Sequence, residues 1–165
     1  MTKRQVFFSF EYKKDVWRAG EVRNMGIVDN SSTFSDNDWE QVRKRTDESI
    51  KRWINEEMEK RSCVIVLIGE TTSTRPWIKY EIQQAYTHNK GLLGVRIDWL
   101  KNENKEYCVA GENPFDLIND YKGDPLSKNV VCFDPSIING PNAYNVIKDK
   151  LPSLIEDAIT KAGCY

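Results

Sequence analysis

Trp77 and Glu81 stand four residues apart in segment 75–82. In a helix, this spacing places an indole and a carboxylate on one face. Such a pair can hold a flat cationic base and act on the sugar beside it. Ile78, Ile82 and Ala85 predict the core stripe of the same helix, about 100° away, so we expect the pair to border a cleft. The alternative is an aromatic residue at a rim and a solvated charge near a helix start.

The composition excludes several classes of partner. The chain has 165 residues, enough for one domain with a real hydrophobic core. Its 24 basic residues are balanced by 25 acidic ones, so no charge excess indicates binding to nucleic acid or to a membrane surface. No run approaches the roughly 20 apolar residues of a membrane span, and the first residues lack the organisation of a signal peptide. We expect a single cytoplasmic domain over residues 1–165, with a ligand in a pocket.

Cysteine and histidine usage argues against two kinds of site. The four cysteines are Cys63, Cys108, Cys132 and Cys164. They are far apart without a Cys-x-x-Cys pair, so we expect no metal site, and two of them, Cys63 and Cys132, lie in apolar runs typical of a core. His88 would have to be the base of any Ser-His or Cys-His scheme. It precedes residues 89–91, Asn-Lys-Gly, which are typical of a helix C-terminus.

Apolar runs of strand length alternate with segments of helical period. This pattern indicates βαβ units and a mainly parallel sheet with helices on both faces. The expected strands are residues 5–10, 26–28, 63–69, 92–97 and 129–133. The expected helices are residues 14–24, about 35–58, a helix from Pro76, and a closing helix over 144–162. The long helix is expected to start at a capping box formed by Ser35 and Asp38, and Pro152 is expected to kink or restart the closing helix. Periodicity fades between about residues 99 and 128, as in functional loops.

The ends of two expected strands suggest the position of a site. In an open parallel sheet, ligands bind beyond the carboxyl ends of the strands, where the segments after residues 5–10 and 63–69 should meet. The site residues that we expect there are Ser9, Phe10, Tyr12, Trp77, Tyr80 and Glu81. Neither Gly-x-x-x-x-Gly-Lys nor Gly-x-Gly-x-x-Gly occurs, which disfavours nucleoside triphosphatases and dehydrogenases.

Several motifs resemble one known family. Residues 6–10, Val-Phe-Phe-Ser-Phe, resemble the opening strand of a TIR domain, and residues 77–81, Trp-Ile-Lys-Tyr-Glu, resemble the TIR segment that carries the catalytic glutamate. More narrowly, the chain is similar to the bacterial TIR-like proteins of the Thoeris antiphage system. That similarity lies in Phe8-Ser9-Phe10-x-Tyr12, Val22-Arg23-Asn24, residues 63–69, Trp77-x-x-Tyr80-Glu81-Ile82 and residues 111–116.

The resemblance implies a flavodoxin-like, three-layer α/β TIR fold with a five-stranded sheet in the order 2-1-3-4-5. It implies an NAD glycohydrolase or ADP-ribosyl cyclase, with NAD as substrate and no resident cofactor. It further implies self-association on activation and a cyclic ADP-ribose isomer that signals to a partner effector. The chain departs from the family after the first strand, where many NAD-cleaving TIR domains carry a basic residue and this chain has Glu11 and Tyr12. Arg18 or Arg23 is then expected to contact the pyrophosphate.

The side chains suit this chemistry. Nicotinamide is already a cationic leaving group, so its loss needs no general acid but leaves positive charge on the ribose, as in glycoside cleavage. Glu81 would stabilise that charge and accept hydrogen bonds from the ribose hydroxyls, while Trp77 offers its face to the pyridinium. The alternative function is a catalytically idle TIR interaction module that works by self-association.

Overall fold

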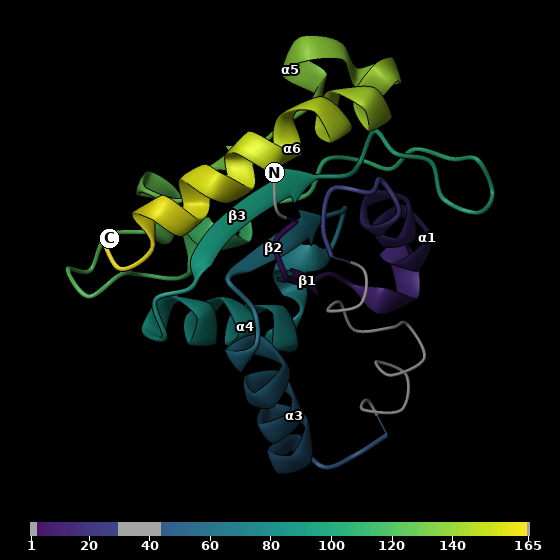
Figure 1. Ribbon diagram of the computed structural model, residues 1–165. Helices are drawn as coiled ribbons and strands as arrows, with labels where there is room; N and C mark the ends of the chain where they lie inside the picture. The colour runs from purple at the N-terminus through teal and green to yellow at the C-terminus, as the bar shows by residue number, and fades with distance from the viewer. Residues whose placement is uncertain (1–2, 30–43, 165) are drawn as a thin grey trace.

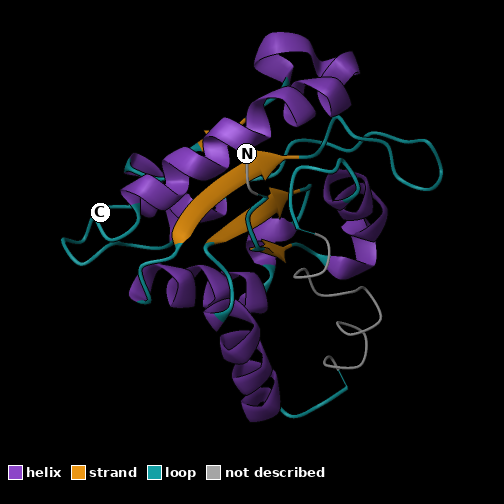
Figure 2. Ribbon diagram, in the orientation of Figure 1, coloured by secondary structure: helices purple, strands orange, loops and turns teal. Residues whose placement is uncertain are grey.

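The computed structural model describes residues 3–29 and 44–164. The strands of these residues form one parallel sheet in the order β1-β2-β3-β4. The strands are β1 (Val6–Ser9), β2 (Cys63–Ile68), β3 (Gly91–Arg96) and β4 (Cys132–Phe133). Figure 2 shows the arrows of β2 and β3 pointing the same way. Ser9 pairs with Val66, and Val66 pairs with Gly94, so the carboxyl ends of the first three strands lie at one edge.

Helices cover both faces of the sheet. The α-helices are α1 (Tyr12–Arg23), α3 (Asp47–Glu59), α4 (Pro76–Thr87), α5 (Ser136–Asn139) and α6 (Ala143–Lys161). The short 3-10 helices are η2 (Thr72–Thr74), η3 (Pro114–Leu117), η4 (Leu126–Lys128) and η5 (Gly140–Asn142). In Figure 1, α6 runs across one face of β3 and α4 across the other. Among the described residues, no helix combines the length and apolarity needed to cross a membrane.

The central strands are apolar because both of their faces are covered. Every residue of β1 and β2 is buried, and five of the six residues of β3 are buried. A strand buried on both faces reads as a continuous apolar run rather than as an alternation. The expected α/β architecture with a parallel sheet is therefore confirmed.

The expected second strand is not formed. Residues 26–28 are bends, and Gly26 has a positive φ of 79°. The backbone N–H of Asp29 donates to the carbonyl of Arg4, at 3.0 Å, so this segment runs near the start of β1 without a ladder of pairs. The described sheet has four strands rather than five, and its order matches the expected strands 1, 3, 4 and 5. The place of the expected strand 2 is unsupported.

The expected long helix over 35–58 does not run uninterrupted. Residues 44–46 are irregular, and α3 begins at Asp47. Thr46, which lies inside the expected helix, is instead the N-cap of α3: its side chain accepts a hydrogen bond from the Ser49 backbone N–H at 3.3 Å. An N-cap hydroxyl marks the start of a helix because it accepts a hydrogen bond from a backbone N–H of the first turn, which has no carbonyl partner within the helix. The expected start at Ser35 and Asp38 lies outside the described residues.

Pro152 does not restart the closing helix. It lies inside α6, which is continuous from Ala143 to Lys161. The helix tolerates the missing N–H because its apolar side, with buried Leu151 and Ile155, packs against the sheet. Tertiary packing outweighs the local preference of proline here.

Candidate functional site

Glu81 lies in the interior, on the second turn of α4. Pro76 occupies the first turn, where its fixed φ and missing N–H are tolerated. Glu81 is only 2% exposed, so it is not the solvated charge of the alternative, and of the pair expected to border a cleft only Trp77 lines the cavity described below. Ile78 and Ile82 are buried, as the helical spacing predicts. The face that carries Glu81 is covered as well, because Ser9 at the end of β1 lies against it.

Two buried polar atoms meet at this point without satisfied hydrogen bonds. Ser9 Oγ and Glu81 Oε2 have no hydrogen-bond partner among the residues that the structure describes. The Ser9 hydroxyl still lies near enough to oppose the effect of burial on the Glu81 carboxyl. A buried polar group without a partner costs about 1–3 kcal/mol, and more when charged. Such a pair is destabilising unless a ligand uses it.

Burial changes the protonation of this carboxyl. It raises the pKa of Glu81 to about 8, and the Ser9 hydroxyl acts in the opposite direction with a smaller effect. In the ligand-free protein at pH 7, most molecules therefore hold Glu81 neutral. A cation placed beside it would lower its pKa and favour the carboxylate.

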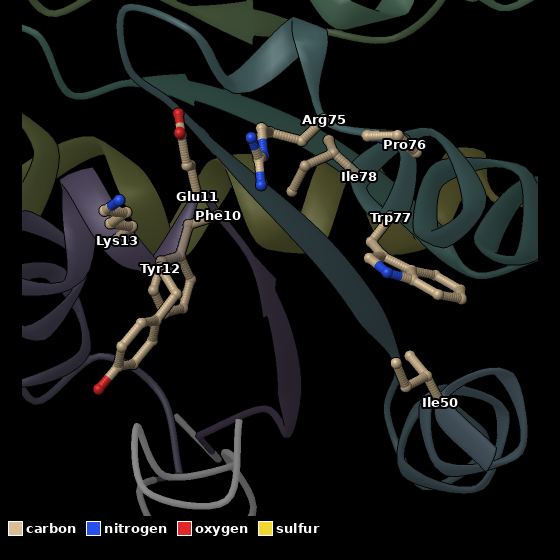
Figure 3. Close-up of a pocket in the computed structure, with 9 residues that line it drawn as sticks. All are labelled: Phe10, Glu11, Tyr12, Lys13, Ile50, Arg75, Pro76, Trp77 and Ile78. Atoms are coloured by element: carbon tan, nitrogen blue, oxygen red, sulfur yellow. The ribbon is translucent and has the colours of Figure 1, made fainter. Parts of the chain in front are cut away.

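A cavity of about 170 Å³ lies where the segment after β1 meets the start of α4. Its walls come from the end of β1, the first turns of α1 and α4, and one residue of α3. The lining residues are Phe10, Glu11, Tyr12, Lys13, Ile50, Arg75, Pro76, Trp77 and Ile78 (Figure 3). The structure thus brings Phe10, Tyr12 and Trp77 to one cavity, whereas Ser9, Tyr80 and Glu81 are not among its lining residues. Ser9 directly precedes Phe10, and Glu81 follows Trp77 and Ile78 by one helical turn, so both buried groups are neighbours, in the chain, of residues that line the cavity.

Tyr80 supports Trp77 from the side instead of lining the cavity. The two rings meet edge to face at 88°, with centroids 5.7 Å apart. The Tyr80 hydroxyl donates to Asn55 Oδ1 of α3 at 3.2 Å, and Lys51 Nζ lies 5.5 Å from the Tyr80 ring centroid. Edge-to-face pairs restrict ring orientation. Tyr80 is therefore placed to position the indole.

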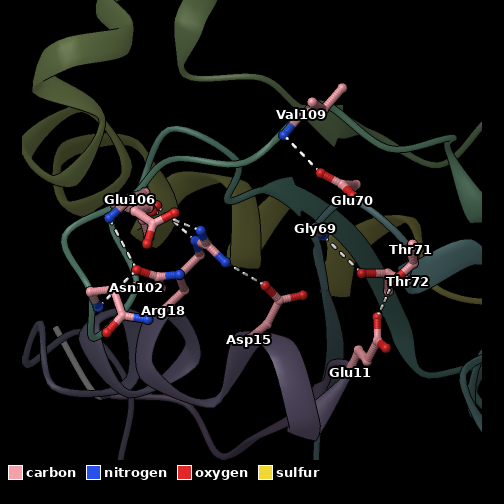
Figure 4. A network of polar contacts seen from close by, with 12 residues as sticks. Glu11, Asp15, Arg18, Gly69, Glu70, Thr71, Thr72, Asn102, Glu106 and Val109 are labelled. Carbon is pink, nitrogen blue, oxygen red and sulfur yellow. Dashed lines mark hydrogen bonds and ion pairs between the residues drawn. The ribbon is translucent and has the colours of Figure 1, made fainter.

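Arg18 is not available for a pyrophosphate, contrary to one expectation. Its side chain is buried and donates three hydrogen bonds: to Asp15 Oδ1 at 2.9 Å, to the Leu100 carbonyl at 2.7 Å and to the Glu106 carbonyl at 2.9 Å (Figure 4). Arg23, the other expected cation, lines a separate hollow that includes Trp17 and Tyr144. Neither arginine lines the cavity beside Trp77.

The acids after β1 also have structural partners. Glu11 Oε2 accepts a hydrogen bond from the Thr71 hydroxyl at 2.5 Å, which ties α1 to the loop after β2. Burial raises the pKa of Asp15 to about 6 despite the opposing effect of Arg18. The Asp15 carboxylate packs where a Cβ at Gly69 would be, so glycine is needed after β2.

The long irregular segment after β3 is held against the carboxyl edge of the sheet. Arg96 Nη1 donates to the Gly111 carbonyl at 2.5 Å, and a Cβ at Gly111 would collide with the carbonyl oxygens of Gly69 and Glu70. The Asn113 side chain accepts from the Phe115 N–H at 3.0 Å, and Phe115 is fully buried. Asn113 to Phe115 therefore lock the loop by packing.

The remaining candidates have structural roles or positions. His88 is the C-cap of α4, as its sequence context indicates. Cys63 is buried, and burial raises the pKa of its thiol to about 12, whereas Cys132 is only partly buried. Sequence reasoning missed Arg75 and Lys13 as cavity residues. The available signal was that Arg75 lies two residues before Trp77 and that Lys13 directly follows Tyr12.

Comparisons with known proteins point to one family. The family model described as "Thoeris protein ThsB, TIR-like domain" matches residues 7–102. A protein of Bacillus cereus (strain MSX-D12), named "Putative cyclic ADP-D-ribose synthase ThsB1", is 33% identical over 123 residues. The alignment covers 72% of this chain and 64% of that protein, which is less than two thirds of its length.

Proposed function

This chain belongs to the TIR-like domain family of the Thoeris protein ThsB, and on that premise we propose that it cleaves NAD, releases nicotinamide and forms a cyclic ADP-ribose isomer. The observation that carries the proposal is a carboxyl oxygen of Glu81 that is buried without a hydrogen-bond partner among the described residues, one helical turn from Trp77 at the cavity. A binding module without catalysis has no use for this costly arrangement, whereas perturbed carboxyls are typical of active sites. The name of the relative supports the same product class.

The proposed reaction begins with loss of the leaving group. The bond between ribose C1′ and the pyridinium nitrogen breaks, and its electron pair leaves with nicotinamide. Positive charge then develops on the ribose, and the ionised Glu81 carboxylate stabilises it. Trp77 presents its indole face to the pyridinium, a contact worth about 0.5–2 kcal/mol.

The nucleophile then decides the product. Attack on C1′ by a hydroxyl or ring nitrogen of the same folded substrate gives a cyclic isomer, and a hydroxyl nucleophile releases its proton to the solvent. Attack by water gives ADP-ribose instead and likewise releases one proton to the solvent. Because Glu81 is covered in the ligand-free protein, side chains at the cavity wall have to move when substrate enters. The pyridinium favours this movement by stabilising the carboxylate.

The biological setting is part of the proposal. The cyclic product would diffuse as a signal to a partner effector in antiphage defence, with self-association accompanying activation. The expected cytoplasmic location, single-domain organisation and absence of a metal or resident cofactor remain predictions.

The direct test is to follow nicotinamide by chromatography when NAD is added to the purified protein and to extracts of phage-infected cells that express it. A further product lighter than ADP-ribose by one water identifies cyclisation. If nicotinamide is released neither by the purified protein nor in infected cells, the proposal is wrong. If the sole second product is ADP-ribose, the chain is a hydrolase and the cyclase part is wrong.

The pH dependence of kcat/KM should report the ionisation of Glu81. We expect kcat/KM to rise about tenfold per pH unit below about pH 8 and to level off above it, because the free enzyme must ionise Glu81. The limb in kcat should lie at lower pH, since the bound pyridinium lowers the pKa of the carboxyl. Initial rates between pH 6 and pH 9.5 measure both profiles. A kcat/KM that stays flat or falls over this range would argue against an ionised Glu81.

Trp77→Ala should raise KM for NAD about 3- to 30-fold, because the cation-π contact is lost. Trp77→Phe keeps an aromatic face and should have a smaller effect. Saturation curves for nicotinamide release measure both. The matched control is Trp17→Ala, which removes a 53% exposed tryptophan of α1 that does not line this cavity. Equal KM values for Trp77→Ala and Trp17→Ala would remove the indole from substrate binding.

A further inference from the structure

Two cationic side chains line the cavity beside Trp77. Arg75 is the N-cap of α4, and Lys13 lies in the first turn of α1. Figure 3 shows the Arg75 guanidinium extending from the start of α4 toward the β1 side of the cavity, with Lys13 on the far side of Glu11. The cavity is therefore flanked by positive charge contributed by two different helices.

The charge of Arg75 has no acidic partner among the described residues. Arg75 forms no ion pair with any residue in ranges 3–29 and 44–164. The nearby acid, Glu11, is instead buried and hydrogen-bonded to Thr71. The positive end of the α4 dipole adds to the potential at this point. An anion could thus bind Arg75 without displacing a partner from the part of the chain that the structure describes.

Other arginines near this edge do not compete for the role. Arg18 is held by Asp15 and by two backbone carbonyls, and Arg23 lines another hollow. An anionic ligand at this cavity would consequently meet Arg75 from the α4 side and Lys13 from the α1 side.

The size of the cavity indicates which part of a ligand it encloses. Its volume of about 170 Å³ is below the roughly 300–1,000 Å³ of pockets that enclose whole drug-sized ligands. It can close around one ring system next to Trp77, while the rest of a dinucleotide must leave through the mouth. Both Arg75 and Lys13 are exposed, so their charged ends can reach a group at that mouth.

We propose that Arg75, assisted by Lys13, binds the diphosphate of a nucleoside-diphosphate-ribose ligand at the mouth of this cavity. The choice of ligand rests on the proposed function, but the binding step does not require catalysis. Arg75 is the main contact because a guanidinium can donate two parallel hydrogen bonds to one phosphate group. Lys13 contributes as a more mobile point charge.

Calorimetric titration with ADP-ribose, and with adenosine as the phosphate-free probe, tests this inference. Arg75→Gln should weaken ADP-ribose binding about tenfold or more, and Lys13→Gln about two- to fivefold. Adenosine should bind both variants as it binds the wild type. The matched controls are Arg52→Gln and Lys14→Gln, which remove exposed charges outside the cavity and should bind ADP-ribose like the wild type.

The outcomes separate this inference from the enzymatic proposal. Glu81→Gln should lose turnover yet keep ADP-ribose binding. If the wild type releases no nicotinamide but binds ADP-ribose through Arg75, the inference is supported and only the proposed NAD cleavage is contradicted. Equal ADP-ribose affinity of Arg75→Gln and wild type overturns the inference, as does a wild type that does not bind ADP-ribose. Equal weakening by Arg52→Gln would show a general charge effect and also overturn it.

Discussion

Replacing Glu81 by glutamine is expected to lower nicotinamide release at least about a hundredfold and, at the same time, to stabilise the fold. The loss of rate follows because a neutral amide cannot balance the charge that develops on the ribose; one preorganised electrostatic group is typically worth about 3–4 kcal/mol in the transition state. The measurement is the initial rate of nicotinamide release at saturating NAD. Glutamine has nearly the shape of glutamate, so the cavity wall should remain intact.

The gain in stability follows from the raised pKa of Glu81. The folded protein keeps a proton on this carboxyl up to about pH 8, whereas the unfolded chain loses it near 4.5. Between these values the folded state binds more protons, so the wild-type free energy of unfolding falls by about 1.4 kcal/mol per pH unit as pH rises. This contribution is fully present below about pH 4.5 and is lost through about pH 8.

Glu81→Gln removes this pH dependence. Its free energy of unfolding should match the wild type near pH 4.5 and exceed it by roughly 4 kcal/mol at pH 8, as measured by urea denaturation. Glu56→Gln, which changes an exposed glutamate of α3, is the matched control and should alter neither rate nor stability. A Glu81→Gln protein with wild-type turnover would remove the carboxylate from the mechanism. A stability difference that does not grow with pH would contradict the burial argument.

Replacing Arg18 by methionine should destabilise the protein by about 3–5 kcal/mol. The substitution leaves the Asp15 carboxylate buried without its ion-pair partner, and breaking a buried pair by removing one member costs about this much. It also releases the Leu100 and Glu106 carbonyls, which anchor the loop after β3 to α1. Urea denaturation at pH 7 measures the loss.

The pH dependence of this loss identifies its cause. Asp15 already has a pKa raised to about 6 in the intact pair, and removing Arg18 takes away a favourable charge and raises it further. The variant should therefore be closest to wild type near pH 5, where Asp15 gains its proton, and furthest from it at pH 8. Asp15→Asn in the same chain should recover part of the loss. Lys14→Met, on the exposed side of α1, is the control; a loss as large as that of Arg18→Met would contradict the buried-pair explanation.

Much of the fold could be predicted from the sequence because strands and helix starts depend on residues that are close together in the chain. Residues 63–69 are apolar at nearly every position, and Pro76 marks the first turn of a helix, so β2 and α4 were predicted almost to the residue. The errors lie where packing or capping competes with periodicity. Thr46 has a place in the apolar period but caps α3, and Pro152 remains inside α6 because the sheet holds that helix.

The candidate site divides in the same way. By itself, the sequence determined the strand ends and the turn of α4 that bring Phe10, Tyr12 and Trp77 to one cavity, since strand direction and helical spacing follow from nearby residues. Only the tertiary structure decided that Glu81 is buried, that Arg18 is committed to Asp15 and that Arg75 faces the cavity. Helical period assigns a side chain to a face, but the segment covering that face comes from elsewhere in the chain. The protonation state of Glu81 and the availability of Arg18 and Arg75 for a ligand therefore depend on segments that are distant in the sequence.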